Sequence, residues 1–192
     1  MGKVYVTFFF IIALKSCTCE SKNASPSTDF IKLSCDSTLY PHLCYRSLER
    51  YANLVHQSEL SLARVALTVT LERTRSAQSF VLSMAREKGL RGLEGQAVKD
   101  CMENVEDSVD RLRQSIGELR RADPAVGNDI SFHLSNVQTW VSAALTDEDT
   151  CLDGFEGANG RVKVAIRHRI VNVAQVTSVG LALVNRFAAR HV

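Results

Sequence analysis

Four long segments of the chain carry apolar residues at alternating spacings of three and four, the repeat that places side chains on one face of an α-helix. They are residues 58–87, 96–121, 123–149 and 161–190. The second is the most regular, with apolar residues at Val98, Met102, Val105, Val109, Leu112, Ile116 and Leu119. Because short connections join the segments, the pattern predicts an all-α fold, an antiparallel up-down-up-down four-helix bundle.

The length and composition agree with a single helical domain. A chain of 192 residues with 45% hydrophobic content can bury one substantial core. Only three prolines and ten glycines are present, which favours long helices over a turn-rich β-fold. Two shorter helical stretches within residues 29–51, broken near Tyr40-Pro41, predict a helical hairpin before the bundle of residues 58–190.

The N-terminus has the pattern of a secretory signal peptide. Lys3 precedes an apolar run from Val4 to Leu14, and small residues follow up to Cys19, so we expect cleavage of residues 1–19. The apolar run is shorter than the roughly 20 residues that a membrane-spanning helix needs. No later segment is expected to span, so no membrane association is predicted after cleavage.

Residues 20–28 are small and polar, which is typical of a flexible leader. Asn23 begins the N-glycosylation acceptor sequence Asn23-Ala24-Ser25, although the following Pro26 disfavours its use. We therefore treat residues 29–192 as the functional domain.

Signal cleavage leaves four cysteines: Cys35, Cys44, Cys101 and Cys151. An even number in an exported chain indicates two disulfides, and four cysteines allow three pairings. Antiparallel packing places Cys101 and Cys151 at the same end of the bundle, so these two can meet.

The charge of the mature chain excludes a general nucleic-acid binder. Cleavage removes Lys3 and Lys15 from 23 basic residues, which leaves 21 against 21 acidic residues. Nucleic-acid binding needs a surplus of Lys and Arg to displace counterions from phosphates. Electrostatic recognition must therefore come from local patches.

No motif in the sequence predicts catalysis. There is no G-x-S-x-G nucleophile motif, and the five histidines are scattered without zinc-ligand spacing. We predict no metal, no cofactor and no enzymatic activity.

The clearest candidate interaction feature is acidic. Glu103, Asp107 and Asp110 are spaced by four and three residues, so they share one helix face, away from the apolar stripe. Such a face is either simply solvated or a docking surface for a basic partner. The sequence leaves both interpretations open.

Several segments resemble the plant invertase/pectin methylesterase inhibitor family, over essentially the whole mature chain. Residues 31–35 and 40–44 hold the first cysteine pair, and residues 97–101 open a helix at the third cysteine. The most specific match is residues 137–146, followed by residues 150–155 around Cys151. The resemblance implies a helical hairpin on a four-helix bundle, with disulfides Cys35 to Cys44 and Cys101 to Cys151.

The resemblance also implies a secreted inhibitor of the apoplast that binds one enzyme molecule over its active-site cleft, without chemistry of its own. Invertase inhibitors typically carry Pro-Lys-Phe between the second and third bundle helices, but residues 122–127 read Ala-Asp-Pro-Ala-Val-Gly. Pectin methylesterase is therefore the expected target, with acid invertase as the alternative. By resemblance, the expected contact positions are Glu103, Asp107, Asp110, Thr150 and Asp153.

Two further interpretations are retained. A related bundle precedes the catalytic domain of some pectin methylesterases, but the sequence stops at Val192, so we expect a free-standing inhibitor. A secreted helical carrier of a small apolar ligand is the alternative of another class, and it would require a cavity among the apolar stripes.

Overall fold

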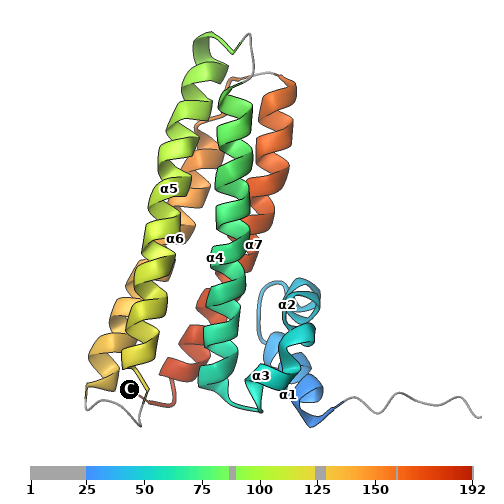
Figure 1. Ribbon diagram of the computed structural model, residues 1–192, viewed down its shortest axis with the longest axis vertical. Coiled ribbons are helices and arrows are strands. Elements are labelled where there is room, and N and C mark those ends of the chain that lie inside the picture. The colour runs from blue at the N-terminus through green and yellow to red at the C-terminus, as the bar shows by residue number, and fades with distance from the viewer. Residues whose placement is uncertain (1–24, 87–89, 124–128, 159, 192) are drawn as a thin grey trace, which may run out of the picture.

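The computed structural model describes residues 25–86, 90–123, 129–158 and 160–191. Four long helices form the bundle: α4 (Glu59–Ala85), α5 (Gly92–Arg121), α6 (Ile130–Asp153) and α7 (Arg161–Ala188) (Figure 1). Extensive contacts join α4 to α5, α5 to α6, α6 to α7 and α7 back to α4, so α5 lies diagonally opposite α7. The predicted all-α bundle is confirmed.

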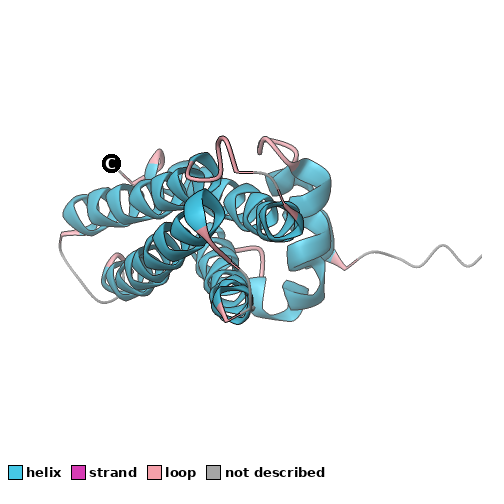
Figure 2. Cartoon of the chain, turned by 90° about the horizontal axis from the view of Figure 1, so that it is seen from above, coloured by secondary structure: helices cyan, strands magenta, loops and turns pink. Residues whose placement is uncertain are grey.

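The N-terminal hairpin consists of α1 (Pro26–Cys35), α2 (Pro41–Leu48), η1 (Glu49–Tyr51) and α3 (Ala52–Val55). It lies beside the lower half of the bundle in Figure 1 and along one side of it in Figure 2. Its buried Ile31, Leu48 and Val55 pack with Leu62 of α4 and Val176 of α7. The hairpin therefore belongs to the same hydrophobic core as the bundle.

α1 begins three residues before the predicted start at Asp29, because Ser25 accepts a hydrogen bond from the backbone N–H of Thr28 at 3.2 Å. A serine cap followed by proline in the first turn is a strong helix start.

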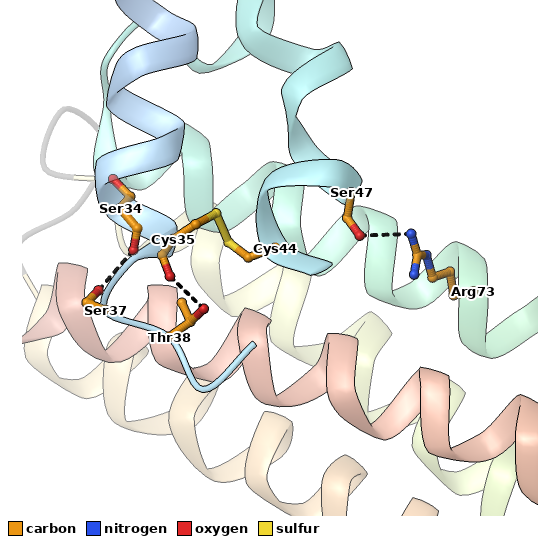
Figure 3. Close-up of a disulfide and its surroundings, with 7 residues drawn as sticks. All are labelled: Ser34, Cys35, Ser37, Thr38, Cys44, Ser47 and Arg73. Carbon is orange, nitrogen blue, oxygen red and sulfur yellow. Dashed lines mark hydrogen bonds between the residues drawn. A yellow bond between two sulfur atoms is a disulfide. The ribbon is translucent and has the colours of Figure 1, made fainter. Parts of the chain in front are cut away.

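The disulfide between Cys35 and Cys44 closes the hairpin (Figure 3). Both cysteines are buried. Thr38 Oγ1 donates to the Cys35 carbonyl at 2.8 Å, and Arg73 Nη2 of α4 donates to Ser47 Oγ at 2.8 Å. The bridge, the turn and a cross-helix hydrogen bond together fix α2 against α4.

Two predicted boundaries were wrong. α5 begins at Gly92, four residues before the predicted start, since a glycine costs a helix only about 1 kcal/mol and the packing of Ala97 and Val98 offsets it. α6 runs to Asp153, past its predicted end at Asp147-Glu148-Asp149, because two of those carboxylates have partners inside the fold.

At its start, α6 follows Asp129, and residues 124–128 of the predicted helix start lie outside the described residues. Asp123, predicted to cap that helix, forms an ion pair of 2.9 Å with Arg64 of α4. The signal peptide, Asn23 and most of the leader also lie outside the described residues.

α7 is long and apolar enough, by length and composition, to span a membrane, so the expectation that no later segment is long and apolar enough was wrong. However, 56% of its most apolar window is buried within the bundle. Val176, Val179 and Leu183 pack against the hairpin and α4. The bundle core accounts for the apolar composition of this helix.

The two disulfides should contribute unequally to stability. Replacing Cys101 and Cys151, which are 50 residues apart, with serine should lower the free energy of unfolding by about 4 kcal/mol on the chain-entropy model. The matched change at Cys35 and Cys44, nine residues apart, should cost about 2.6 kcal/mol on the same model. Urea unfolding of the two double variants measures both values, and a larger loss for the hairpin pair would contradict the entropic account.

Candidate functional site

α5 and α6 form the most extensively packed pair of helices in the bundle. The Cys101 to Cys151 disulfide links them near one end, with both cysteines buried. Ten residues further along α5 and four residues back along α6, Arg111 Nε donates to Asp147 Oδ2 at 2.6 Å. A covalent bond and an ion pair thus fix the relative position of the two helices.

The predicted acidic face lies on the outer surface of α5. Glu103, Asp107 and Asp110 are all exposed, while Val105, Val109 and Leu112 are buried on the opposite side. The separation of these carboxylates from the apolar stripe, expected from their spacing, is confirmed. We call these three residues the acidic ridge.

The pairings of the acidic ridge are weak. Lys99 Nζ lies 4.0 Å from Glu103 Oε1, and both side chains are about two-thirds exposed. Arg113 Nη1 contacts Asp110 Oδ1 at 2.5 Å, again at an exposed position. Within the described residues, no cation lies within 4 Å of Asp107. Exposed pairs of this kind contribute about 0 to 1 kcal/mol, so these carboxylates can change partners at little cost.

Thr150 and Asp153 lie in the last turn of α6, on either side of Cys151, and both are exposed. Thr150 Oγ1 donates to the Thr146 carbonyl at 2.8 Å. The bridge and the packing therefore bring the five predicted contact positions onto one pair of adjacent helices.

Asp147 of α6 pairs with Arg111 of α5. Burial raises the pKa of Asp147 and the charge of nearby Asp107 adds to the increase, whereas the Arg111 contact opposes it. The ion pair is nevertheless short, at 2.6 Å. Sequence reasoning treated Asp147 as a helix end, and its pairing with Arg111 was missed because the partner is 36 residues away.

Glu148 is the most unusual side chain of the bundle, because it is fully buried. Its Oε1 accepts hydrogen bonds from Ser108 Oγ of α5 at 2.8 Å and Thr177 Oγ1 of α7 at 2.9 Å. Its Oε2 has no partner among the described residues. Burial raises the pKa of Glu148 to about 8, against the opposing effect of the two hydroxyl donors. Its spacing of four from Ala144 and three from Cys151 continues the inward stripe, and this was the available signal.

No group of three His, Cys, Asp or Glu side chains that could hold a metal ion occurs among the described residues. Glu148 lies inside the core. Glu118 Oε2 and His133 Nδ1 lie 2.7 Å apart in a hydrogen bond between α5 and α6. The pKa of Glu118 is lowered chiefly by its hydrogen bond with His133.

The fold is a disulfide-linked four-helix bundle with an N-terminal helical hairpin. A family model described as plant invertase/pectin methylesterase inhibitor matches residues 29–183. The chain belongs to this family, whose members are inhibitor proteins rather than enzymes.

Curated relatives agree with this assignment. The 21 kDa protein of Daucus carota is 48% identical over 171 residues, which cover 88% of this chain and 89% of the carrot protein. Pectinesterase inhibitor 9 of Arabidopsis thaliana is 47% identical over 193 residues, which cover 96% and 95% of the two chains. A crystal structure of a mutant form of a pectin methylesterase inhibitor from Arabidopsis shares the fold. Its TM-score is 0.64 at 21% identity, and the match covers 79% of this chain and 92% of that chain.

The buried Glu148 predicts a pH-dependent stability. Its pKa of about 8 in the folded state lies above the ordinary value of 4.5. The stabilisation of the neutral carboxyl is therefore fully present below the ordinary value and is lost as the pH rises through about 8. Between these values, this group should lower the free energy of unfolding by about 1.4 kcal/mol per pH unit.

The variant Glu148→Gln cannot ionise, so its stability should fall less steeply with pH than that of the parent protein. Urea unfolding of both proteins is measured at pH values between 5 and 8, about one pH unit apart. The difference between their free energies of unfolding gives the contribution of Glu148, because the two proteins share all other titratable groups. Parallel curves for the two proteins would mean that Glu148 is not neutral in the folded state.

Proposed function

We propose that this chain is a secreted inhibitor of pectin methylesterase that binds one esterase molecule through the exposed surface of α5 and α6. The observation that supports this proposal best is the acidic ridge, held in place by the Cys101 to Cys151 disulfide and the Arg111–Asp147 ion pair. Family membership and the Arabidopsis pectinesterase inhibitors among its relatives support the choice of target.

Inhibition of this kind is steric. A pair of packed helices presents a convex surface, which fits the long cleft that an enzyme needs to admit a polymer. From Glu103 to Asp110 the ridge extends roughly 10 Å along α5. Thr150 and Asp153 add polar contacts beside the disulfide. No bond is made or broken, and the polymer is excluded while the inhibitor is bound.

The electrostatics favour a basic partner. Glu103 and Asp110 exchange weak exposed contacts with Lys99 and Arg113 for contacts with cations of the esterase, and Asp107 brings a further carboxylate. Complementary charge mainly accelerates association and orients the partners. Since the disulfide and ion pair already order the helices, little entropy is lost on binding.

Secretion to the cell wall is part of the proposal. Disulfides form and persist in oxidising compartments, and both cysteine pairs are bonded in the structure. The apolar run from Val4 to Leu14 supplies the export signal expected from the sequence.

Acid invertase is the second candidate target, because the family description includes invertase inhibitors. The absence of Pro-Lys-Phe from residues 122–127 favours the esterase. The carrier alternative requires a cavity inside the bundle, but the apolar hollow between α2, α4 and α7 holds only about 10 Å³, and the hollow of about 460 Å³ on α7 is open on the surface. Ligand pockets usually have several hundred Å³.

The acidic ridge can be tested by charge removal. The triple variant Glu103→Gln, Asp107→Asn, Asp110→Asn should change the free energy of unfolding by about 0.5 kcal/mol or less, because all three side chains are exposed. Its association with the esterase should be slower and less sensitive to salt than that of the parent, since rim charges act mainly on association. Stopped-flow or surface-binding kinetics at two ionic strengths measure the effect.

A matched control removes three exposed carboxylates elsewhere, with Asp36→Asn, Glu72→Gln and Asp129→Asn. This control should inhibit as the parent does. If the ridge variant, the control and the parent associate with the esterase at equal rates at low salt, the ridge is a solvated helix face and not a docking surface.

Stoichiometry and target are tested together by titration. Esterase activity should fall linearly to near zero at about one equivalent of mature, oxidised inhibitor when the enzyme concentration exceeds Kd, and acid invertase should be little affected. Strong inhibition of invertase with no effect on several pectin methylesterases would reverse the assignment.

A further inference from the structure

The charges of the last two bundle helices are segregated by sign. α6 contains four acidic residues and no Lys or Arg, whereas α7 contains five Lys or Arg residues and no acidic residue. Four of the five basic residues of α7 fall in its first three turns: Arg161, Lys163, Arg167 and Arg169. The second half of the helix packs against the hairpin and is largely apolar.

Bundle stability does not require this cluster. Within the described residues, none of these four side chains forms an ion pair with a carboxylate. Glu94 reaches this end of α7, but it accepts a hydrogen bond from the Lys163 backbone N–H at 3.4 Å, while Lys163 Nζ donates to the Ala158 carbonyl. Cations near a helix N-terminus also oppose the helix dipole. Arg161 and Lys163, which lie in the first turn of α7, are therefore placed unfavourably with respect to the helix dipole.

The outward side of this region forms a shallow hollow on α7. Charged and polar donors line it together with two valine side chains, namely Lys163, Val164, Arg167, His168, Val171 and Asn172. Val164 is 69% exposed, and Val171 is half-buried. The hairpin lies beside the other half of the bundle, so it leaves this surface uncovered (Figure 1). We call Arg161, Lys163, Arg167 and His168 the basic face.

The positive surface continues along the seam between α7 and α4. Arg169 stacks over the ring of Phe80 at 4.8 Å, and Arg73 donates to Asn172 Oδ1 at 3.2 Å. Burial lowers the pKa of Arg73, and the nearby charge of Arg50 lowers it further. On the other side, Asp149 of α6 lines a neighbouring hollow with Val171 and Gln175, which bounds the surface.

The basic face and the acidic ridge are placed on different sides of the molecule. α5 and α7 are diagonal in the bundle, so their outer surfaces point away from each other. An esterase whose contacts centre on the ridge of α5 therefore meets a different side of the bundle from the one that carries the basic face.

We infer that the basic face binds uronate-rich, de-esterified stretches of the polymer on which the esterase acts. The inference rests on the proposed function, which supplies the polymer. Hydrolysis of a methyl ester by water releases methanol and leaves a carboxylate, so the product is an anion and the substrate is neutral. Guanidinium and ammonium groups complement such carboxylates, hydroxyl groups accept from Asn172 and His168, and Val164 provides an apolar contact for sugar C–H groups.

Binding to the de-esterified polymer would hold the inhibitor near the esterase. A protein held on the product polymer through α7 is concentrated where an esterase has already acted, with its ridge free to meet the enzyme. Linking two binding events in this way raises the effective concentration of the second.

The experiment measures binding to the polymer without any esterase. Mature, oxidised protein is run by affinity electrophoresis against polygalacturonate and against the same polymer fully methyl-esterified. We expect retardation by polygalacturonate alone, weakened when the ionic strength rises from about 0.02 M to about 0.15 M. The double variant Arg161→Gln, Arg167→Gln should lose affinity about tenfold or more, and its inhibition of the esterase should be unchanged.

The matched control, Lys32→Gln with Arg120→Gln, removes two exposed charges from α1 and α5 and should bind as the parent does. Equal loss in the two double variants would reduce the effect to net charge and overturn the inference. Absence of retardation by polygalacturonate would also overturn the inference. So would sedimentation showing that the basic face binds the acidic ridge of a second copy of the chain in a salt-dependent way. The polymer assay contains no enzyme, so a negative result counts against polymer binding alone. A lack of esterase inhibition would count against the proposed function.

Discussion

Two contacts hold α5 against α6 at different positions along the helices. They are the disulfide between Cys101 and Cys151 and the ion pair between Arg111 and Asp147. The most extensive helix contact of the bundle lies between α5 and α6. The surface that we assign to the esterase is built on this pair, so its shape depends on contacts that are covalent or partly buried. A docking surface on two fixed helices loses little conformational freedom when it binds, which distinguishes it from a loop-based site.

Charge is distributed by helix rather than evenly over the surface. Of the four residue types Asp, Glu, Lys and Arg, α6 contains only the acidic ones and α7 only the basic ones. The acidic ridge lies on α5, diagonally opposite α7. A chain whose formal net charge is only +2 can therefore present local faces of opposite sign. So small a net charge gives little general attraction for polyanions, but it does not limit what a local face recognises.

The bundle interior contains one fully buried glutamate, Glu148, within the described residues. Three helices meet at this side chain, since Ser108 of α5 and Thr177 of α7 both donate to Oε1. A buried carboxylate is costly when charged, and its raised pKa keeps it neutral over the acidic range. Glu148 alone is expected to lower the free energy of unfolding as the pH rises from about 4.5 toward about 8.

The sequence by itself determined the helical class, the four segments and the exposure of Glu103, Asp107 and Asp110, because helix periodicity is local information. It also limited the cysteines to two bridges, and family resemblance selected their pairing. The start of α5 and the end of α6 were missed, because Gly92 has a low helix propensity and an acidic run such as residues 147–149 is unfavourable near a helix C-terminus. Distant packing overrides both local signals. Only the tertiary structure placed the helix that carries Thr150 and Asp153 beside α5, and paired Arg111 with Asp147. These features join residues tens of positions apart, and their positions are set by the packing of whole helices.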